Sequence, residues 1–563
     1  MIGTGGPALK LLMPCVRAAS GRLAAGLAFA ALASAAKLAM PWTLKFAIDD
    51  VFQQKNLQLF LPLLGGLMLA CVLRNAFVLA GRRVMLTAGE KTALSVRRLL
   101  FTHLQSLSIA YHKSHKPGES LSRIDGDVSQ VESFVEVGIP KTINTLLLAA
   151  GVLVMLFWAN PLLAGVALVI LPVHLALYIA FKTRIKAGNR TMREHESGLA
   201  SGLVETLLGA EVMSASGAEE HERRRFYERA SHLLESRLRL GSLQLWQEVM
   251  GDIAVGAGTV GVYYYGGRLV MSGAMTMGEF TAFLGYMAML YPLSLALMTQ
   301  MSQTLGAMAS AERIMDTLEL VPDVAEAPGA VELPAVAGAV SFEGVAFGYG
   351  GQRMILRDMS FRVDPGDVVA VTGPVGSGKS TIGSLLARFY DASKGRILID
   401  GMDLGLLSLR QVRREVGIVF QEPFLFADTI AGNIRYSRPS ARPVEVAAAA
   451  DAAGLTPLLQ TLPKGIDTMI GDGGIQLSLG QKHQIDMARA LLKDPRILIL
   501  DSVFTEGDDT HRREQERLFR AVSKGRTTFV INPSSFILEN ADKVVRLRRD
   551  GSAEVENRNA FVS

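Results

Sequence analysis

The chain has 563 residues, of which 49% are hydrophobic and 20% charged, and its formal net charge is +5. This length allows two or more domains, and so apolar a composition indicates membrane spans rather than an ordinary soluble protein. The modest positive charge does not indicate nucleic-acid binding, because the basic residues cluster beside apolar runs, as in the cytoplasmic loops of membrane proteins. With only two cysteines, Cys15 and Cys71, the sequence predicts no disulfide framework.

The first apolar run extends from Leu23 to Ile48. Basic residues precede it, and Ala33-Ser34-Ala35 within it faintly resembles the cleavage site of a secretory signal. The run continues past Lys37, however, and further apolar runs follow it. We therefore expect a retained membrane span rather than a removed signal peptide.

The clearest membrane signal is the stretch from Thr142 to Phe181, which contains no Asp, Glu, Lys or Arg. Ala159-Asn160-Pro161 interrupts it midway. Because a helix needs about 20 residues to cross a bilayer, the stretch predicts two spans joined by a tight outer turn. Lys141 and Lys182 flank the pair on the expected cytoplasmic side.

Three more spans complete a predicted set of six within a transmembrane domain at residues 1–320. Six spans place both ends of this domain in the cytoplasm. The two long connections between spans are rich in Lys, Arg and Glu at helical spacing, so they predict helices that project beyond the bilayer. The additional spans are Leu59–Gly81, Ile253–Gly267 and Phe280 to about Met308. The expected fold is thus an all-α transmembrane domain in the lipid bilayer, with long cytoplasmic extensions.

Several ionisable side chains fall within or beside these spans, where charges are costly and often functional. Lys37 and Arg74 are equally compatible with lining a substrate cavity and with snorkelling to the interface. His174 favours a packed, hydrogen-bonded histidine. A position near the end of a span is favoured for Lys45, Glu248 and Asp252.

A second domain is predicted after a linker. Residues 321–340 are rich in Pro, Ala, Gly and Val without clear periodicity, which indicates the linker. Residues 341–563 then predict an α/β domain, in which Val340–Phe347 and Met359–Val363 alternate as strands. Asp367–Thr372 is a short apolar strand.

The segment after this strand is rich in glycine. Its glycines let backbone N–H groups turn inward around phosphates, and the helix expected from Thr381 presents its positive N-terminal end. Lys379 is expected to reach the β- and γ-phosphates, and Ser380 to ligate Mg²⁺. The segment reads Gly373-Pro374-Val375-Gly376-Ser377-Gly378-Lys379-Ser380-Thr381. It predicts a P-loop that binds ATP. Further along, Ile497–Asp501 is an apolar run ending in an acid, which places Asp501 near Mg²⁺.

Between these elements lies Leu477-Ser478-Leu479-Gly480-Gln481, which leads into a helix predicted over Lys482–Leu492. With this segment the whole chain resembles a half-transporter of the ATP-binding-cassette exporter family. The family's signature loop reads L-S-G-G-Q, and Leu479 replaces its first glycine here. In the family, this loop contacts the γ-phosphate held by the opposite subunit. The resemblance therefore implies that Ser478, Gly480 and Gln481 contact ATP bound by a second half-transporter chain, and that the dimer exports an unidentified substrate.

Other family elements can be placed in the same way. The resemblance assigns Tyr349 to the aromatic that stacks on adenine. It assigns Gln421 to the loop glutamine that touches Mg²⁺ and senses the membrane domain. Ile470–Gly474 resembles a loop that crosses to the partner. The regions around Pro117–Arg123 and Gly209–Gly217 resemble the two coupling helices, with ordinary helix–turn sequence as the alternative.

The sequence departs from the family at two catalytic positions. The residue after Asp501 is a glutamate in the family, where it orients and polarises the attacking water, but it is Ser502 here. The switch histidine of the family falls on Pro533, and Asn532 offers a weaker contact only if the register slips by one. No catalytic group is therefore intact.

The loop after Ser502 is also unusual. Thr505-Glu506-Gly507-Asp508 stands where the family has S-A-L-D. Glu506 and Asp508 lie too far along the chain to replace the missing glutamate by simple register.

The leading interpretation is a subunit of a heterodimeric ATP-driven exporter in a bacterial inner membrane, with its nucleotide domain in the cytoplasm. Its own site would hold ATP and hydrolyse it poorly, while its signature loop completes the competent site of a different partner with intact Glu and His. Two alternatives stay open: an ATP-gated regulatory or channel-like membrane protein, and a slow homodimeric flippase.

Overall fold

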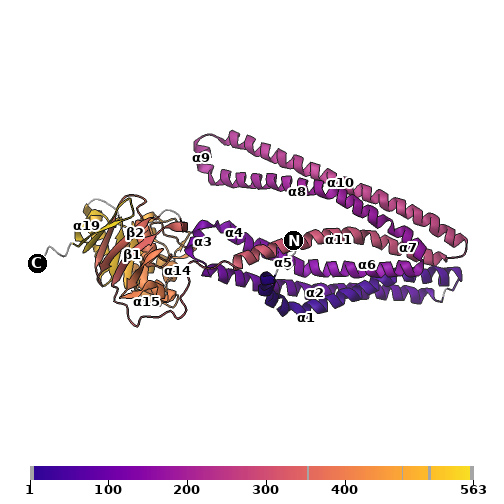
Figure 1. The fold of residues 1–563 in the computed structure, drawn as a ribbon, viewed down its shortest axis with the longest axis horizontal. Helices are drawn as coiled ribbons and strands as arrows, with labels where there is room; N and C mark the ends of the chain where they lie inside the picture. The colour runs from indigo at the N-terminus through magenta and orange to yellow at the C-terminus, as the bar shows by residue number, and fades with distance from the viewer. Residues whose placement is uncertain (1–5, 57, 352–353, 472, 505–508, 558–563) are drawn as a thin grey trace. The chain divides into compact units, whose positions relative to one another are not determined.

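The computed structural model describes residues 6–56, 58–351, 354–471, 473–504 and 509–557 (Figure 1). The chain divides into two compact units. One consists of residues 1–102 and 121–319, and the other of residues 103–120 and 320–563. The first unit is helical, and the second contains the β-sheets.

The helical unit is built mainly from long helices (Figure 1). They are α1 (Gly6–Phe46), α2 (Phe60–Ser106), α6 (Ile139–Ala159), α8 (Ile170–Leu208), α10 (Glu219–Met271) and α11 (Met277–Leu318). Shorter elements join them: η1 (Ala47–Gln53), η2 (Ser122–Asp127), α5 (Val128–Ser133), η3 (Phe134–Gly138), α7 (Pro161–Leu168) and α9 (Ala210–Ala215).

Four helical segments of the described chain are long and apolar enough to cross a membrane: Ser20–Gln53, Gln58–Ser106, Pro117–Ala159 and Pro161–Leu208. They contain the first four predicted spans. The predicted fifth and sixth spans lie inside the continuous helices α10 and α11.

The predicted turn between the third and fourth spans is confirmed. Helix α6 ends at Ala159, and Asn160 caps the next helix by accepting a hydrogen bond from the backbone N–H of Leu163 at 2.9 Å. Pro161 then occupies the first helical position, where its missing N–H costs nothing.

The apolar core of the helical unit lies among α6, α7, α10 and α11. Phe283 and Tyr286 of α11 are fully buried in it. The Tyr286 hydroxyl donates to the backbone oxygen of Leu38 at 2.8 Å, which ties α1 to α11. Helix α1 also packs on α6, and α8 packs along α10.

The second unit contains two main sheets. A four-stranded sheet has the order β2-β1-β4-β5, and a six-stranded sheet has the order β12-β11-β3-β10-β9-β6. In the larger sheet, β11, β3, β10, β9 and β6 are parallel, and β12 is an antiparallel edge. The strands are β1 (Val340–Phe347), β2 (Leu356–Val363), β3 (Val368–Thr372), β4 (Lys394–Ile399), β5 (Met402–Asp403), β6 (Val416–Val419), β7 (Asp428–Thr429), β8 (Met469–Ile470), β9 (Ile497–Asp501), β10 (Thr527–Ile531), β11 (Lys543–Leu547) and β12 (Ala553–Asn557).

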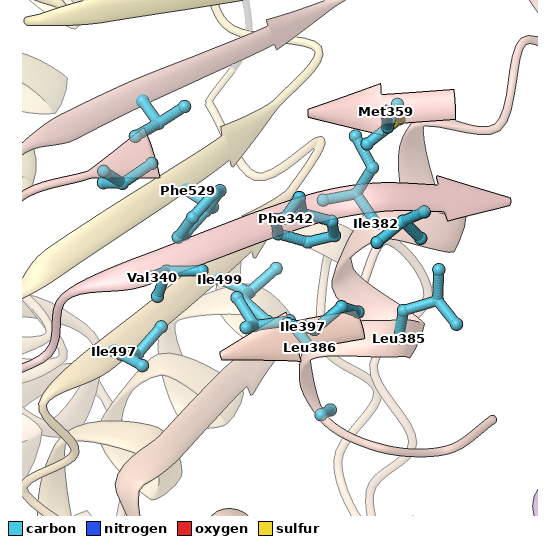
Figure 2. Close-up of a cluster of buried hydrophobic side chains, with 14 of the residues drawn as sticks. Val340, Phe342, Met359, Ile382, Leu385, Leu386, Ile397, Ile497, Ile499 and Phe529 are labelled. Carbon is cyan, nitrogen blue, oxygen red and sulfur yellow. The ribbon is translucent and has the colours of Figure 1, made fainter. Parts of the chain in front are cut away.

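One apolar cluster joins the two sheets and the helix after the P-loop. Phe342 of β1, Phe529 of β10 and Ile382 of α12 are buried together in it (Figure 2). Burying aromatic and branched side chains on both faces of a strand suits a parallel sheet that is covered on both sides. This core fixes the ends of β3, β9 and β10, where the predicted site residues lie.

The helices of this unit are α3 (Ile109–Ser114), α12 (Lys379–Leu386), α13 (Leu409–Glu415), α14 (Ile430–Arg435), α15 (Pro443–Ala452), α16 (Thr456–Thr461), α17 (Leu479–Leu492), α18 (Asp509–Ser523) and α19 (Ser535–Asn540). Two predicted boundaries shift. Helix α12 begins at Lys379 rather than Thr381, and α17 begins at Leu479 rather than Lys482, because Ser478 caps it.

The predicted linker is attached to the nucleotide unit. Its Val331 N–H donates to the backbone oxygen of Leu406 at 3.0 Å, and Leu333 exchanges two hydrogen bonds with the side chain of Gln411. Residues 103–120 also belong to this unit, where the Ser108 hydroxyl donates to Asp323 at 2.9 Å. This segment contains α3 and nearly all of α4 (Pro117–Leu121), which begins at Pro117, the first residue of the region that resembles a coupling helix.

Candidate nucleotide-binding site

The glycine-rich segment connects the end of β3 to the start of α12. Gly373, Gly376 and Gly378 have φ values of +148°, +80° and +94°, which side-chain-bearing residues rarely adopt. A Cβ on Gly378 would lie 2.7 Å from Ile355 Cγ2. These three positions therefore require glycine, and the loop can bring its backbone close to a ligand.

The P-loop side chains fit a phosphate group. Lys379 Nζ donates to the backbone oxygens of Gly373 and Pro374, each at 2.8 Å, so it lies folded over its own loop. The Ser377 hydroxyl is buried without a hydrogen-bond partner in the described part of the chain. Burial lowers the pKa of Lys379, and the nearby Asp501 carboxylate opposes that shift. Phosphate oxygens would supply this lysine with a stronger partner than neutral carbonyls do.

Asp501 and Ser380 are the two predicted metal ligands. Asp501 ends β9 and is 9% exposed, while Ser380 lies exposed in the first turn of α12. No cluster of three or more His, Cys, Asp or Glu side chains suited to a metal occurs among the described residues. One carboxylate and one hydroxyl fit a Mg²⁺ ion that takes its other ligands from phosphate and water.

The position after Asp501 is held by a small hydrogen-bond network. The Ser502 backbone N–H donates to Ile531 at 3.0 Å, and its hydroxyl donates to Asp501 Oδ1 at 3.2 Å. Asn532, the first residue after β10, donates from Nδ2 to the Ser502 hydroxyl at 2.8 Å. Pro533 follows directly. The structure thus brings the two departures from the family pattern together.

Tyr349 lies beside the P-loop helix, in an aromatic cluster. Its ring packs edge-on against Phe347 and Tyr390, with centroid distances of 4.9 and 5.0 Å. Its hydroxyl shares a 3.1 Å hydrogen bond with Thr381 Oγ1, and the side chain stays 38% exposed. Sequence reasoning did not find Tyr390, because only the fold brings it next to Tyr349.

Gln421 lies exposed after the end of β6. Two side chains of α17 hold the backbone around it: His483 Nε2 bonds to the Gln421 oxygen at 2.9 Å, and Asp486 accepts from the Phe420 N–H at 3.1 Å. Burial raises the pKa of Asp486, and its bonds to Phe420 and Arg489 oppose that shift. Sequence reasoning missed both residues. Their signal is two polar residues three positions apart among the buried positions of α17.

The signature segment forms the N-terminus of α17. Ser478 and Gln481 make a reciprocal capping box: the Ser478 hydroxyl accepts from the Gln481 N–H at 3.3 Å, and Gln481 Oε1 accepts from the Ser478 N–H at 2.9 Å. Leu479 is 57% exposed, and no atom lies within 4 Å of where a Cβ on Gly480 would be. No hydrogen bond within the described ranges links this segment to the P-loop of the same chain. The signature segment is therefore an exposed helix N-terminus.

Two family models together match most of the chain. Residues 23–293 match the ABC transporter transmembrane region, and residues 356–505 match ABC transporter. The chain belongs to the ABC transporter family.

Similar proteins cover nearly the whole of this ABC transporter. The Bacillus subtilis (strain 168) ABC transporter ATP-binding protein YknV is 32% identical over 533 residues, which are 94% of this chain and 88% of that protein. An ATP-dependent lipid A-core flippase from Syntrophus aciditrophicus (strain SB) is 30% identical over 541 residues, 96% and 89% of the two chains. A bacterial Atm1-family ABC exporter solved with ATP bound matches with a TM-score of 0.81 and 26% identity, covering 96% of each chain.

These matches establish an exporter subunit with a helical transmembrane domain followed by an α/β nucleotide-binding domain. ABC exporters work as dimers in a membrane, and the nucleotide domain binds ATP. Two predicted features of this ABC transporter lie outside the described residues. They are Asp472, in the loop predicted to cross to the partner, and the segment 505–508 after the Ser502 position.

The ionisable residues predicted within or beside the spans of the helical unit line two different cavities, except Lys45. Lys37 and Arg74 line a cavity of about 680 Å³ between α1, α2 and α6. A second cavity, of about 690 Å³, lies between α8, α10 and α11; among the residues that line it are His174, Glu248 and Asp252. Glu248 and Asp252, which are expected near the end of a span, are exposed and also line this cavity. His174 is buried, as expected.

Lys45 lines neither cavity. Its ammonium group pairs with Glu279 of α11 at 2.8 Å, next to the capping box at the start of that helix. This pairing agrees with the expectation that Lys45 holds a structural position near the end of a span.

Proposed function

We propose that this ABC exporter subunit works in a heterodimer. Its own P-loop holds ATP and Mg²⁺ at a site that hydrolyses poorly, and its signature segment completes the competent site of a different half-transporter. The observation that carries the proposal is the pairing of Ser502 with Asn532 directly before Pro533. Both positions that supply catalytic side chains in the family carry groups that cannot replace them.

The chemistry of Ser502 supports a slow site. A serine hydroxyl is neutral at physiological pH and cannot take up a proton from the attacking water as a carboxylate does. Here it is also occupied, because it donates to Asp501 and accepts from Asn532. Loss of a positioned general base lowers a rate by about 10²–10⁴-fold, or roughly 3–5 kcal/mol of barrier.

The binding half of the site supports retained ATP binding. The three positive-φ glycines, Lys379 and the buried Ser377 hydroxyl all suit phosphate, and Ser380 with Asp501 suits Mg²⁺. If the site had no function, natural selection would not preserve a loop with three positive-φ glycines. A site that binds but does not turn over can hold the two nucleotide domains of a dimer together.

The signature segment supports a role toward the partner. Its capping box orients the Ser478 hydroxyl at a helix N-terminus, whose N–H groups and dipole attract phosphate. Leu479 is the only departure from the family loop and points to solvent rather than into the domain. The names of similar proteins, a lipid A-core flippase and a putative multidrug export protein, support an export role, which we place in a bacterial inner membrane. The substrate of this chain stays unassigned.

Single-turnover hydrolysis tests the proposal. The chain purified alone is expected to bind ATP through Lys379 but to release phosphate about 10²–10⁴-fold more slowly than a family member with the glutamate. Rapid hydrolysis that Lys379→Ala abolishes would overturn the degenerate site.

The native complex, purified through a tag on this chain, tests the asymmetry. We expect Ser478→Arg to abolish its steady-state ATP hydrolysis, because the partner's site loses its signature contact. Ser502→Ala should leave hydrolysis nearly unchanged, because that position does no catalysis. A complex containing two copies of this chain and no other half-transporter, by native mass spectrometry, would exclude the heterodimer.

A further inference from the structure

The cavity between α1, α2 and α6 has a strongly positive lining that no part of the nucleotide machinery uses. Its cationic side chains are Lys37, Arg74, Arg82, Arg83 and Lys141, and one acidic side chain, Glu136, also lines it. None of the five cations has an ion pair or a side-chain hydrogen bond with any residue that the structure describes. For Lys37 and Arg74, which lie within predicted spans, this is unusual, because charges there normally pair with one another.

Two polar residues line the same cavity, Ser34 of α1 and Asn144 of α6, and their side chains are hydrogen-bonded to each other. The Ser34 hydroxyl also bonds to the backbone oxygen of Ala30 at 2.8 Å, so this pair has partners within the protein. The five cations therefore face a single carboxylate, that of Glu136, and the polar part of the cavity suits an anion.

The two deepest cations lie in the same half of the bilayer. Lys37 is roughly 17 Å along the helix axis from the predicted outer end of its span at Ile48, and Arg74 is roughly 23 Å from the predicted outer end of its span at Leu59. Because the hydrocarbon core is about 30 Å thick, both lie in its cytoplasmic half. Arg82 lies roughly 12 Å beyond Arg74, at the expected cytoplasmic interface.

The rest of the lining is apolar. Phe77 and Leu148 contribute to it, and Phe29 stacks on Phe77 with a centroid distance of 6.3 Å. Close contacts at Gly26 and Gly81 bring α1 and α2 together there: a Cβ on Gly81 would lie 3.2 Å from Phe29 Cβ. The cavity thus combines hydrocarbon walls with a row of cations that extends to the cytoplasmic side.

The second cavity provides a contrast. It has a similar volume, but Glu248 and Asp252 give it acidic side chains, and the described residues that line it include no Lys or Arg. The cationic character is therefore a property of the first cavity and not of the membrane unit in general.

The geometry points to an amphiphile with an anionic head group as the ligand of this cavity. Lys37 and Arg74 would bind the phosphate or carboxylate head, and the walls around Phe77 and Leu148 would bury its hydrocarbon part. Arg82, Arg83 and Lys141 would draw the anion in from the cytoplasmic leaflet. This assignment of a substrate class depends on the family's export role and not on which nucleotide site hydrolyses ATP.

Lipid binding to the native complex, purified in detergent through a tag on this chain, tests the inference by native mass spectrometry. The probes are phosphatidylglycerol, phosphatidylcholine with the same acyl chains, and inorganic phosphate. We expect phosphatidylglycerol to bind at least about tenfold more tightly than phosphatidylcholine, since a charge-assisted contact is lost with the zwitterionic head. In the Lys37→Met/Arg74→Gln variant this preference should disappear.

Two further variants make the result decisive. Lys182→Met removes a cation of α8 that does not line the cavity, and it should keep the preference. Arg74→Lys keeps the charge and should keep most of the preference, which covers the case in which the double variant fails to fold. ATP binding by each variant checks its folding.

Each result of the lipid-binding experiment either supports the inference or overturns it. Equal affinity for the two lipids, or a preference that survives in a folded double variant, would overturn the inference. Inorganic phosphate that competes with phosphatidylglycerol at the same concentration would show a free-anion site and overturn the amphiphile. Because lipid binding is read without hydrolysis, failure here leaves the degenerate-site proposal standing, and failure of the single-turnover test leaves this one standing.

Discussion

The Nδ2 atom of Asn532 donates a hydrogen bond to the Oγ atom of Ser502 over 2.8 Å. The two residues follow neighbouring parallel strands, β10 and β9, and both have a positive φ, +52° and +56°. Each therefore sits at a tight exit from its strand, with its side chain directed at the other. A change at either position alters the environment of the other, so restoring hydrolysis requires the two positions to be considered together.

Ser502→Glu with Pro533→His is expected to raise single-turnover hydrolysis at this chain's own site by about 10²-fold or more. Ser502→Glu alone should gain less. The Asn532 amide would then hydrogen-bond to the new carboxylate and hold it in its charged, less basic form. Phosphate release from ATP prebound to the chain, followed by rapid quench, measures both.

Lys379→Ala in the double variant provides the control, and it should remove the gained activity because the phosphates lose their lysine. If the double variant hydrolyses no faster than the unmodified chain, Ser502 and Pro533 do not account for the slow site.

The aromatic cluster around Tyr349 leads to a second prediction. Tyr349→Ala should weaken ATP binding about 10- to 100-fold, the range expected for loss of one base-stacking aromatic ring. Tyr349→Phe should change affinity by less than about fivefold, because it keeps the ring and loses only the 3.1 Å bond to Thr381. Displacement of a fluorescent ATP analogue measures the affinities.

Tyr436 provides the matched control. It is also an exposed tyrosine of the nucleotide unit, but it stacks on Phe426, at 4.4 Å between ring centroids. Tyr436→Ala should leave ATP affinity unchanged. Equal losses for Tyr349→Ala and Tyr436→Ala would indicate a general effect on the domain rather than stacking on adenine.

The sequence predicts the parts of this molecule that local patterns encode. The P-loop, Asp501 and the Asn160 turn depend on residues adjacent in the chain, and they lie where they were expected. The start of α17 at Leu479 could also be predicted from the sequence, since Ser478 and Gln481 have the spacing of a capping box.

What the sequence does not predict depends on contacts between distant segments. The bond between Ser502 and Asn532 joins the ends of two strands, and Tyr390 reaches Tyr349 only through the fold. The cavities are the clearest case. Lys37 and Arg74 have ambiguous roles as single charges, and only the packing of α1, α2 and α6 shows that they share one cavity. The spacing of residues along a span shows which face of that helix they share, but it does not show which other helix packs against that face.

The start of α11 offers a stability prediction. Asp49 of η1 accepts hydrogen bonds from the Gly278 N–H at 2.9 Å and the Thr276 hydroxyl at 2.6 Å. A Cβ on Gly278 would lie 2.6 Å from the Asp49 carboxylate. Gly278→Ala should therefore displace that carboxylate from the helix N-terminus and cost about 2–3 kcal/mol. Thermal unfolding of the full chain in detergent should show a lower midpoint.

Gly267→Ala on α10 is the control for this prediction. No atom lies within 4 Å of its added Cβ, and its φ is not positive, so alanine should be neutral or should stabilise the helix by up to about 1 kcal/mol. A drop of similar size in both variants would mean that any methyl group on these helices disturbs packing, and that Asp49 has no special role.

Lys493, the residue that caps the end of α17, predicts a pH effect on the nucleotide domain. Burial lowers its pKa to about 8, aided by Arg413 and opposed by Glu415, and its ammonium donates to the Val416 oxygen at 2.9 Å. In the unfolded chain a lysine titrates near pH 10.4. Between these two values the unfolded state holds more protons, so the free energy of unfolding rises with pH, by at most about 1.4 kcal/mol per pH unit.

Lys493→Met should remove this rise. The difference in stability between the unmodified chain and the variant is expected to shift in favour of the unmodified chain as the pH goes from 8 to 10, and to stay constant below pH 7. Comparing the two proteins cancels the many other groups that titrate in this range. Lys464→Met, at an exposed lysine of the same unit, should show no such shift. A constant difference across the whole range for Lys493→Met would mean that the buried ammonium keeps its ordinary pKa, because backbone carbonyls or water compensate for its burial.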